Sequence, residues 1–262
     1  MLKSIYTPAS GALAQERVLE VIANNLANVN TVGFKGDGVS FSLLEAEPER
    51  AYNNPIPPAN YKIQFEDLQY LHGNEIGYAG VSDVYRDVSQ GPAIETQNPT
   101  DLMIEGEGHF SVQTPDGVRY MRAGALSVSS DGVLMSQGGH PVLGEKGNIV
   151  VRAGDFEVNH LGEVYQDGQY IDRLLVYQFQ DQNKLERVGD NYFTFNGDPS
   201  EAKVIGQPAI RQGALEGSNV NPIKNLTAMI MAHRCYEAYQ KAVSNFDSMM
   251  EKSSNVIGDV RA

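Results

Sequence analysis

Cysteine, tryptophan and long apolar runs are scarce or missing in this sequence of 262 residues. Its single cysteine, Cys235, excludes an internal disulfide, and no cysteine and histidine spacing typical of zinc sites occurs. Met1 to Val29 holds no run of about 18 apolar residues, so we expect no membrane-spanning helix there. Gln15, Glu16 and Arg17 interrupt the same segment, which argues against a cleaved secretion signal.

Basic residues are also few. The chain has 20 Lys and Arg against 33 Asp and Glu, and 20 − 33 gives a net charge of −13 at pH 7. Binding to nucleic acid or to an anionic membrane needs a basic face, so we expect neither partner. Hydrophobic residues make up 41% of the chain, which is ordinary for a folded protein with room for one or two domains.

Catalytic signatures are missing as well: no P-loop, HExxH or GxSxG motif is present. Gly106-Glu107-Gly108 matches only the start of a dinucleotide fingerprint, and we interpret it as a strand-end bulge. Cys235 is expected to be a buried small residue. The histidines lack ligand spacing, so we expect packed or surface side chains at His72, His109, His140, His160 and His233. The sequence therefore predicts no catalytic residue, no metal and no cofactor.

The N-terminal segment predicts a helix over residues 2–29. Apolar residues recur at spacings of three and four, which is typical of coiled coils. Pro8 removes a helix hydrogen bond, so the first turn is expected to be separate. The predicted stripe is Leu2, Ile5, Ala9, Ala12, Leu19, Leu26 and Val29.

This helix ends in the stretch NNLANVNTVGFK, Asn24 to Lys35. Its Asn and Thr side chains bond to nearby backbone and compete with helix continuation. Gly33 can adopt a positive φ without steric cost, so we expect it there in a joint that ends the helix. Composition alone favours the simpler interpretation, a capped helix followed by a loop.

Residues 36–70 predict an extended connection, because Pro55, Pro57 and Pro58 fix φ and disfavour a central strand. Residues 71–215 then alternate apolar and polar side chains in short segments, which indicates an antiparallel β domain. Turn signals with an expected positive φ separate these segments at Asp116-Gly117, Asp131-Gly132, Asp167-Gly168 and Asn196-Gly197.

The last helix is predicted over residues 217–257, with Pro222 in its first turn. Its apolar stripe steps by three and four over a length far above the average helix. The stripe residues are Met229, Ala232, Tyr236, Tyr239, Val243, Phe246, Met250, Ser253 and Ile257. We predict an α+β fold: terminal helices (1–35 and 216–262) pair in a coiled-coil-like domain, 36–70 connect, and an antiparallel β domain (71–215) is inserted.

Three stretches resemble a known family. NNLANVNTVGFK resembles the signature that follows the N-terminal helix of bacterial flagellar rod and hook proteins. GALEGSNVNPIKNLTAMIM (Gly213 to Met231) resembles their C-terminal region, and SQGPAIETQNPTDLMIEGEGHFSV (Ser89 to Val112) is a weaker match. Within the family, LEGSNVNP and HPVLGEKGNIVV (His140 to Val151) are most similar to the proximal-rod protein, with the distal-rod protein second.

The resemblance implies a structural subunit of the basal-body rod that crosses the periplasm. Its implied partners are further copies and other flagellar axial proteins, and the type III flagellar export apparatus in transit. The implied joint motif is Asn24, Asn25, Leu26, Ala27, Asn28, Thr31, Gly33, Phe34 and Lys35. The implied C-terminal motif is Leu215, Glu216, Gly217, Ser218, Asn219 and Val220. The expected interface stripe between subunits is Met229, Tyr236, Tyr239, Val243, Phe246 and Met250.

Two alternatives come from other classes. A secreted β-domain enzyme or binding module would need a cleft of converging polar residues, and the sequence nominates none. A soluble adaptor would bind one partner helix in a groove, and sedimentation would separate it from a polymer subunit.

Overall fold

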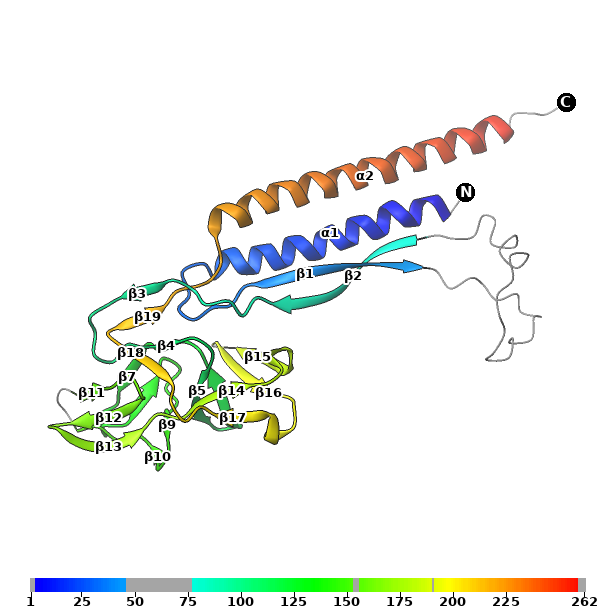
Figure 1. Cartoon of the computed structure of the whole chain (residues 1–262). Helices are drawn as coiled ribbons and strands as arrows, with labels where there is room; N and C mark the ends of the chain where they lie inside the picture. The colour runs from blue at the N-terminus through cyan, green and yellow to red at the C-terminus, as the bar shows by residue number, and fades with distance from the viewer. Residues whose placement is uncertain (1–2, 46–76, 153–155, 190, 259–262) are drawn as a thin grey trace, which may run out of the picture. The chain divides into compact units, whose positions relative to one another are not determined.

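The computed structural model describes residues 3–45, 77–152, 156–189 and 191–258 (Figure 1). Helices and antiparallel strands place the chain in the α+β class, as predicted. The chain divides into two compact units. We call Met1–Asn24, Gly38–Tyr85 and Ile223–Ala262 the helical unit, and Asn25–Asp37 and Arg86–Pro222 the β unit. The proline-rich part of the predicted connection and His72 lie outside the described residues.

The first helix, α1, runs without a break from Lys3 to Ala27. The expected separate first turn was wrong, because the helix continues through Pro8. Proline there removes only one bond, close to the start of the helix. The helix also ends two residues earlier than predicted. Asn28 N–H donates to the carbonyl of Asn25 at 3.2 Å, so the chain tightens into three-residue turns at this point.

The buried face of α1 differs from the predicted stripe. Leu19 and Leu26 are only half-buried, and Leu13 is 67% exposed. The reason lies at Gly11, where an added Cβ would lie 2.7 Å from the ring of Tyr239 on the last helix. Close approach of the two helices at this point therefore favours small residues. The buried residues of α1 in the helical unit are Pro8, Gly11, Ala14, Val21 and Ile22.

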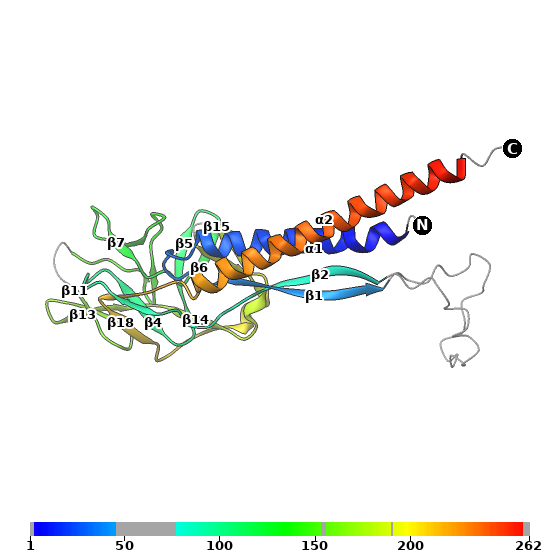
Figure 2. The ribbon, with the colours of Figure 1, turned by 90° about the horizontal axis from the view of Figure 1, so that it is seen from above.

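The last helix, α2, spans Pro222–Gly258 and begins at the proline predicted for its first turn. In Figures 1 and 2, α1 and α2 run side by side in opposite directions. Strands β1 (Asp37–Glu45) and β2 (Gly77–Arg86) form a two-stranded sheet in the same unit. Neither described helix is long and apolar enough to cross a membrane.

Along α2, the predicted stripe is the least exposed face. Ala232 is buried, and the other members up to Ser253 are half-buried, whereas most intervening residues are exposed. The side chain of Ile257 lies outside the described residues. Cys235 is exposed, so its expected burial was wrong. It falls between the stripe positions 232 and 236, on the outward side of the helix.

The β unit consists of short strands. Their bounds are β3 Ala93–Glu95, β4 Leu102–Glu105, β5 His109–Thr114, β6 Gly117–Met121, β7 Leu126–Val128, β8 Leu134–Ser136, β9 Leu143–Gly144, β10 Gly147–Asn148, β11 Phe156–Val158, β12 Glu163–Gln166, β13 Gln169–Arg173, β14 Val176–Phe179, β15 Leu185–Gly189, β16 Tyr192–Phe195, β17 Ala202–Val204, β18 Ala209–Gln212 and β19 Ala214–Glu216. Short 3-10 turns, η2 and η3, cover Gln182–Lys184 and Pro199–Glu201. The largest described sheet has the order β15-β16-β6-β5-β14-β17. A three-stranded sheet, β11-β12-β13, and pairs such as β18-β4 and β19-β3 complete the unit.

Strand β5 lies in the middle of the largest sheet and is buried on both faces. Because side chains alternate along a strand, Phe110 and Val112 enter the main core on one face. His109 points to the opposite face, where its ring meets Phe179 and Phe193 edge-on, with centroids 5.6 and 5.7 Å away. The main core consists of Leu102, Ile104, Phe110, Val112, Met121, Leu126, Leu134, Val142, Ile149, Val151, Phe156, Val158, Val164, Leu174, Val176, Tyr192 and Ile210.

Three of the four predicted turn signals adopt the expected backbone. Gly117 and Gly132 have positive φ between β5 and β6 and between β7 and β8, and Asp167-Gly168 joins β12 to β13 with φ of 52° and 74°. The fourth expectation was wrong, because Gly197 has no positive φ and leads from β16 into η3. An added Cβ there would lie 2.3 Å from the ring of Phe195, so close packing accounts for this glycine.

Candidate functional site

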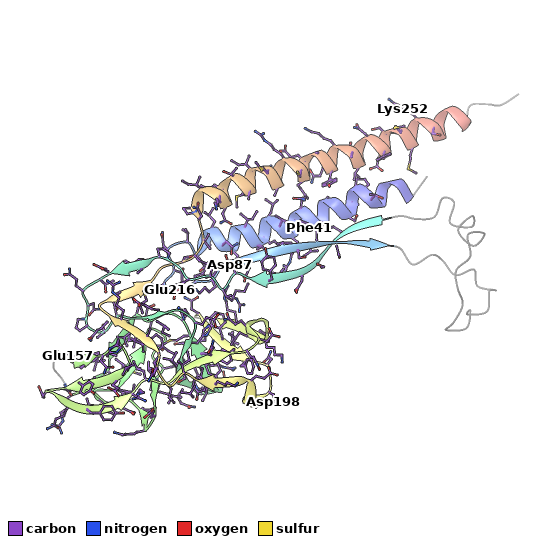
Figure 3. All side chains as sticks on the ribbon, viewed as in Figure 1. Phe41, Asp87, Glu157, Asp198, Glu216 and Lys252 are labelled. Atoms are coloured by element: carbon purple, nitrogen blue, oxygen red, sulfur yellow. The ribbon has the colours of Figure 1, made fainter. Side chains whose placement is uncertain are left out.

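The three stretches that carry the family resemblance converge in the β unit around one buried carboxylate, Glu216 (Figure 3). This residue ends β19 and has a side chain that is 1% exposed. Its neighbours come from the joint motif, from the stretch that begins at Ser89, and from the residue that follows β6. The structure therefore joins segments that lie far apart in the sequence.

The joint motif reaches Glu216 through a tight turn. Gly33 has a φ of 68°, as predicted, and its N–H donates to the backbone carbonyl of Glu216 at 2.7 Å. An added Cβ at Gly33 would lie 2.6 Å from the backbone nitrogen of Ala123. Glycine is thus favoured here both by the left-handed backbone and by the close approach of the backbone that follows β6. Phe34 follows with a side chain that is fully buried.

Lys35 supplies the first cation to the buried carboxylate. Its Nζ donates to Glu216 Oε1 at 2.6 Å and to the carbonyl of Ser89 at 2.7 Å. Burial is the largest influence on its pKa and lowers it, while the hydrogen bond to Glu216 acts in the opposite direction. A buried amine in this position stays charged only because the carboxylate is held against it.

Arg122 supplies the second cation and ties the network to the glycine pair between β4 and β5. Its Nε donates to Glu216 Oε2, and its remaining donors reach the carbonyls of Ile104, Gly106 and Gly108. Gly106 and Gly108 have φ of 84° and 142°, which aims their carbonyls at the guanidinium. These glycines therefore build an arginine-binding loop between two strands.

The backbone around the network is held by two amides. Asn25 and Asp37 exchange two hydrogen bonds: the side-chain amide donates to the carbonyl of Asp37 at 2.7 Å and accepts from its N–H at 2.9 Å. Asn219 Oδ1 accepts from the N–H of Gly36 at 2.8 Å, and its amide donates to the carbonyl of Asp87. Asn25 of the joint motif and Asn219 of the C-terminal motif therefore fix the backbone at the start of β1 through hydrogen bonds.

The predicted site residues divide between the two units. Gly33, Phe34 and Lys35 meet the C-terminal motif directly, and Leu215, Glu216, Gly217, Ser218 and Val220 of that motif are all buried. Earlier members of the joint motif serve the turn that follows α1, as where Thr31 Oγ1 donates to Asn28 at 3.2 Å. The predicted interface stripe of α2 belongs to the helical unit and does not contribute to this network.

Sequence reasoning missed two members of the site, Arg122 and Gly91, whereas His109 is packed, as predicted. Gly91 donates its N–H to Glu216 Oε1 at 2.9 Å, and an added Cβ would lie 2.0 Å from the carbonyl oxygen of Gly217. One signal was present in the sequence. Glu216, at the end of β19, and Arg122, directly after β6, each lie next to an apolar core position, where an unpaired charge would be costly.

We expect Gly33→Ala to lower the free energy of unfolding of the chain by more than about 2 kcal/mol. A left-handed backbone costs a residue with a Cβ about 1–2 kcal/mol, and the contact with Ala123 adds to this cost. Gly168→Ala is the matched control, because Gly168 has a φ of 74° but open space around it. Urea unfolding of both variants measures the difference. Equal losses would contradict a role for the close approach.

Comparison with known proteins agrees with the three convergent stretches. The family model described as "Flagella basal body rod protein" matches residues 5–35. The model described as "Flagellar hook protein FlgE/F/G D1 domain" matches residues 103–166, and "Flagellar basal body rod FlgEFG protein C-terminal" matches residues 211–256. The chain is 34% identical to the flagellar basal-body rod protein FlgG of Agrobacterium fabrum, covering 95% of this chain and 97% of the relative.

The chain belongs to the flagellar basal-body rod protein family. It is also 28% identical to FlgF of Caulobacter vibrioides, over 99% of this chain and all of the relative, and 33% identical to FlgG of the same organism. The family models cover the two predicted motifs. The N-terminal model ends at residue 35, in the joint motif, and the C-terminal model begins at residue 211, just before the C-terminal motif. These two motifs meet at Glu216. The chain is thus a structural subunit of the flagellar basal body.

Proposed function

We propose that the chain assembles into the rod through its paired terminal helices, as a structural subunit without enzymatic activity. The observation that carries this proposal is the incomplete cover of α2 in the helical unit. Several apolar side chains of α2 face solvent: Ile223, Leu226 and Ile230, which are spaced by three and four residues, and Met231, next to Ile230. Their exposed fractions are 75%, 46%, 56% and 62%, on the side opposite the stripe that faces α1.

A groove between the two helices supports the same proposal. It measures about 470 Å³ and lies in the helical unit. Its lining combines apolar and polar side chains from both helices: Ala9, Ala12, Leu13, Glu16, Tyr236, Gln240, Val243, Ser244 and Asp247. A neighbouring helix that presents apolar residues at helical spacing would fill such a groove and cover Leu13. We therefore propose coiled-coil-like packing of α1 on α2, extended by helices from adjacent subunits.

The lengths of the helices also favour neighbours. α1 has 25 residues and α2 has 37, so α2 is longer by 37 − 25 = 12 residues, or about 18 Å. With Gly11 beside Tyr239 and the helices antiparallel, the end of α2 near Met250 extends past the start of α1. Contacts that repeat from copy to copy without closing generate a helical tube, which is the architecture a rod requires.

Within the rod, we propose the proximal position, with transit through the type III flagellar export apparatus. The similarity of LEGSNVNP and HPVLGEKGNIVV to proximal-rod proteins and the full-length match to FlgF support it. The distal position is the second candidate, because FlgG relatives share more identical residues with the chain. Expression of the chain in strains lacking FlgF or FlgG, followed by a swimming assay, separates the two positions.

We expect Phe246→Ala to block incorporation into rods and abolish swimming while leaving the thermal unfolding of the β unit unchanged. Phe246 is half-buried near the end of the helical pair, where α1 gives little further cover. A core aromatic would instead cost about 3–5 kcal/mol of monomer stability on truncation. Lys241→Ala, at an exposed position of the same helix, is the control and should swim normally. A destabilised β unit with rods still assembling would contradict the interface assignment.

A further inference from the structure

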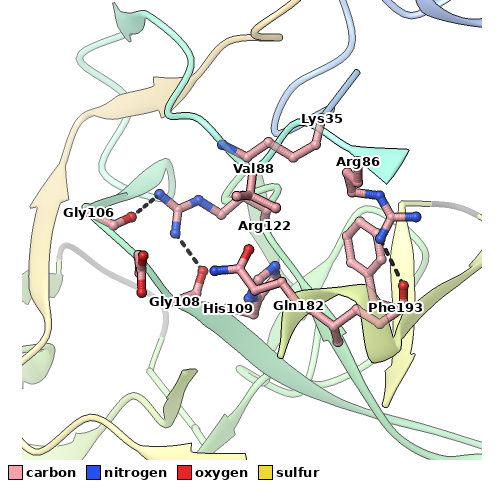
Figure 4. A pocket seen from close by; sticks show the side chains of 11 residues that line it. Lys35, Arg86, Val88, Gly106, Gly108, His109, Arg122, Gln182 and Phe193 are labelled. Atoms are coloured by element: carbon pink, nitrogen blue, oxygen red, sulfur yellow. Dashed lines mark hydrogen bonds between the residues drawn. The ribbon is translucent and has the colours of Figure 1, made fainter. Parts of the chain in front are cut away.

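A small cavity of about 30 Å³ opens beside the Glu216 network, entirely within the β unit (Figure 4). A single water needs about 10–15 Å³ on this measure, so the cavity has room for one small polyatomic ligand or a few waters. Its lining combines apolar side chains with three cationic groups, a histidine and an amide: Lys35, Arg86, Val88, Gly106, Glu107, Gly108, His109, Arg122, Gln182, Leu185 and Phe193.

The first group of charges at the cavity is Lys35, Arg122 and Glu216, in which two cations share one carboxylate. Lys35 and Arg122 both pair with Glu216, and the three side chains are 7%, 4% and 1% exposed. A single carboxylate therefore balances two buried cations. Arg122 uses four of its five N–H donors on Glu216 and on three carbonyls, and the ammonium of Lys35 has a third proton beyond its two bonds.

The second group repeats this imbalance. Arg86 and Arg187 share Asp37, with nitrogen to oxygen distances of 3.6 Å in both cases. Arg86 lies over the ring of Phe193, and its pKa is lowered first by burial and then by the charge of Arg187. Two carboxylates, Glu216 and Asp37, thus form ion pairs with four cations at and beside the cavity, in a chain whose net charge is −13.

Two buried side-chain nitrogens of the lining have no hydrogen-bond partner among the described residues. They are Nδ1 of His109, a side chain more than nine-tenths buried, and Nε of Arg86, whose nearest carboxylate oxygen in the ion pair with Asp37 is 3.6 Å away. Unpartnered buried nitrogens are costly and rare, so each one indicates a missing partner. The amide of Gln182 lies at the same cavity in Figure 4.

The acidic member of the lining does not cancel this excess. Glu107 is the one carboxylate among the described lining residues, and it is exposed to solvent. Its Oε2 accepts a hydrogen bond from Gln178 at 2.7 Å, outside the lining. Among the described residues, the cations that line the cavity form ion pairs with Glu216 and Asp37, and Glu107 is not one of these partners.

We propose that this cavity binds one small inorganic anion of the size range from chloride to sulfate. Arg86 Nε, the third proton of Lys35 and Nδ1–H of His109 would donate to it, with the Gln182 amide at the mouth. Charge-assisted hydrogen bonds of this kind are the strong ones, and they would satisfy both unpartnered nitrogens. The anion would also offset the excess positive charge beside the joint motif, which ties the two ends of the chain together.

The test uses the full chain and sodium sulfate, with sodium chloride at matched ionic strength as the second probe. Calorimetry measures the affinity and stoichiometry, and nitrogen-15 NMR follows the imidazole of His109. We expect saturable binding at one site per chain with a shift of the His109 resonances. Arg86→Gln should weaken binding by at least about tenfold, since a charged hydrogen bond is lost.

Two further variants make the result decisive. Gln182→Glu places a carboxylate at the mouth and should abolish anion binding even where Arg86→Gln fails to fold. Arg211→Gln removes an arginine whose partner, Glu95, is exposed and remote from the lining, so it should bind as the wild type does. Absence of any saturable shift at His109, or equal affinity in Gln182→Glu and Arg211→Gln, would overturn the proposal.

Discussion

Glu216→Gln is expected to lower the free energy of unfolding of the chain by about 3–5 kcal/mol, the usual cost of removing one partner from a buried ion pair. Two cations depend on this carboxylate, and both are less than a tenth exposed. Glutamine keeps the shape of the side chain and can still accept from Gly91, but it leaves Lys35 and Arg122 without a counter-charge. The loss is therefore electrostatic, with no cavity term.

Glu95→Gln is the matched control for this change. Glu95 also pairs with an arginine, Arg211, at 2.5 Å, but the two side chains are 67% and 45% exposed. Exposed pairs contribute about 0–1 kcal/mol, so this variant should unfold close to the wild type. Urea unfolding of the purified chain measures both variants. A loss below about 1 kcal/mol for Glu216→Gln would show that the network is not essential for the stability of the β unit.

Helix positions and most turns were predictable from the sequence because their signals are local. The stripe of α2 is read from spacings of three and four, and the structure places it on the least exposed face of the helix. The positive φ of Gly33 was likewise predictable from its neighbours. Which face of α1 is buried was not predictable, because Gly11 packs against the ring of Tyr239, more than 200 residues further along the sequence.

The ion network could not be predicted from the sequence for the same reason. Lys35 and Glu216 are 181 residues apart, and Arg122 and Glu216 are 94 apart. Local periodicity carries no information about which charges meet across such separations. The family resemblance named the right stretches, but it could not say that one carboxylate joins them. His109 is packed, one of the two outcomes predicted for it, on a strand that is buried on both faces.

His109 is also expected to make the stability of the chain depend on pH. Its ring lies against Phe179 and Phe193, and burial, followed by the charges of Arg122, Lys35 and Arg86, lowers its pKa from 6.5 to about 3. Below pH 6.5 the unfolded chain binds a proton at this histidine that the folded chain does not bind until about pH 3. Stability from this group is therefore complete above pH 6.5 and falls as the pH is lowered.

The expected slope is about 1.4 kcal/mol per pH unit. Between pH 6.5 and about pH 4.5, before most carboxyl groups titrate, the chain should lose about 2–3 kcal/mol through His109. His109→Phe keeps a ring between Phe179 and Phe193 and removes the titration, so its stability should be nearly flat over this range. Urea unfolding at several pH values, in buffers without multivalent anions, measures the slopes.

His140→Phe is the control, because His140 also packs edge-on against an aromatic ring, that of Tyr192, but is only half-buried. This variant should keep the steep decrease in stability of the wild type. If His109→Phe and the wild type lost stability in parallel as the pH was lowered, the buried imidazole would not be the group that titrates.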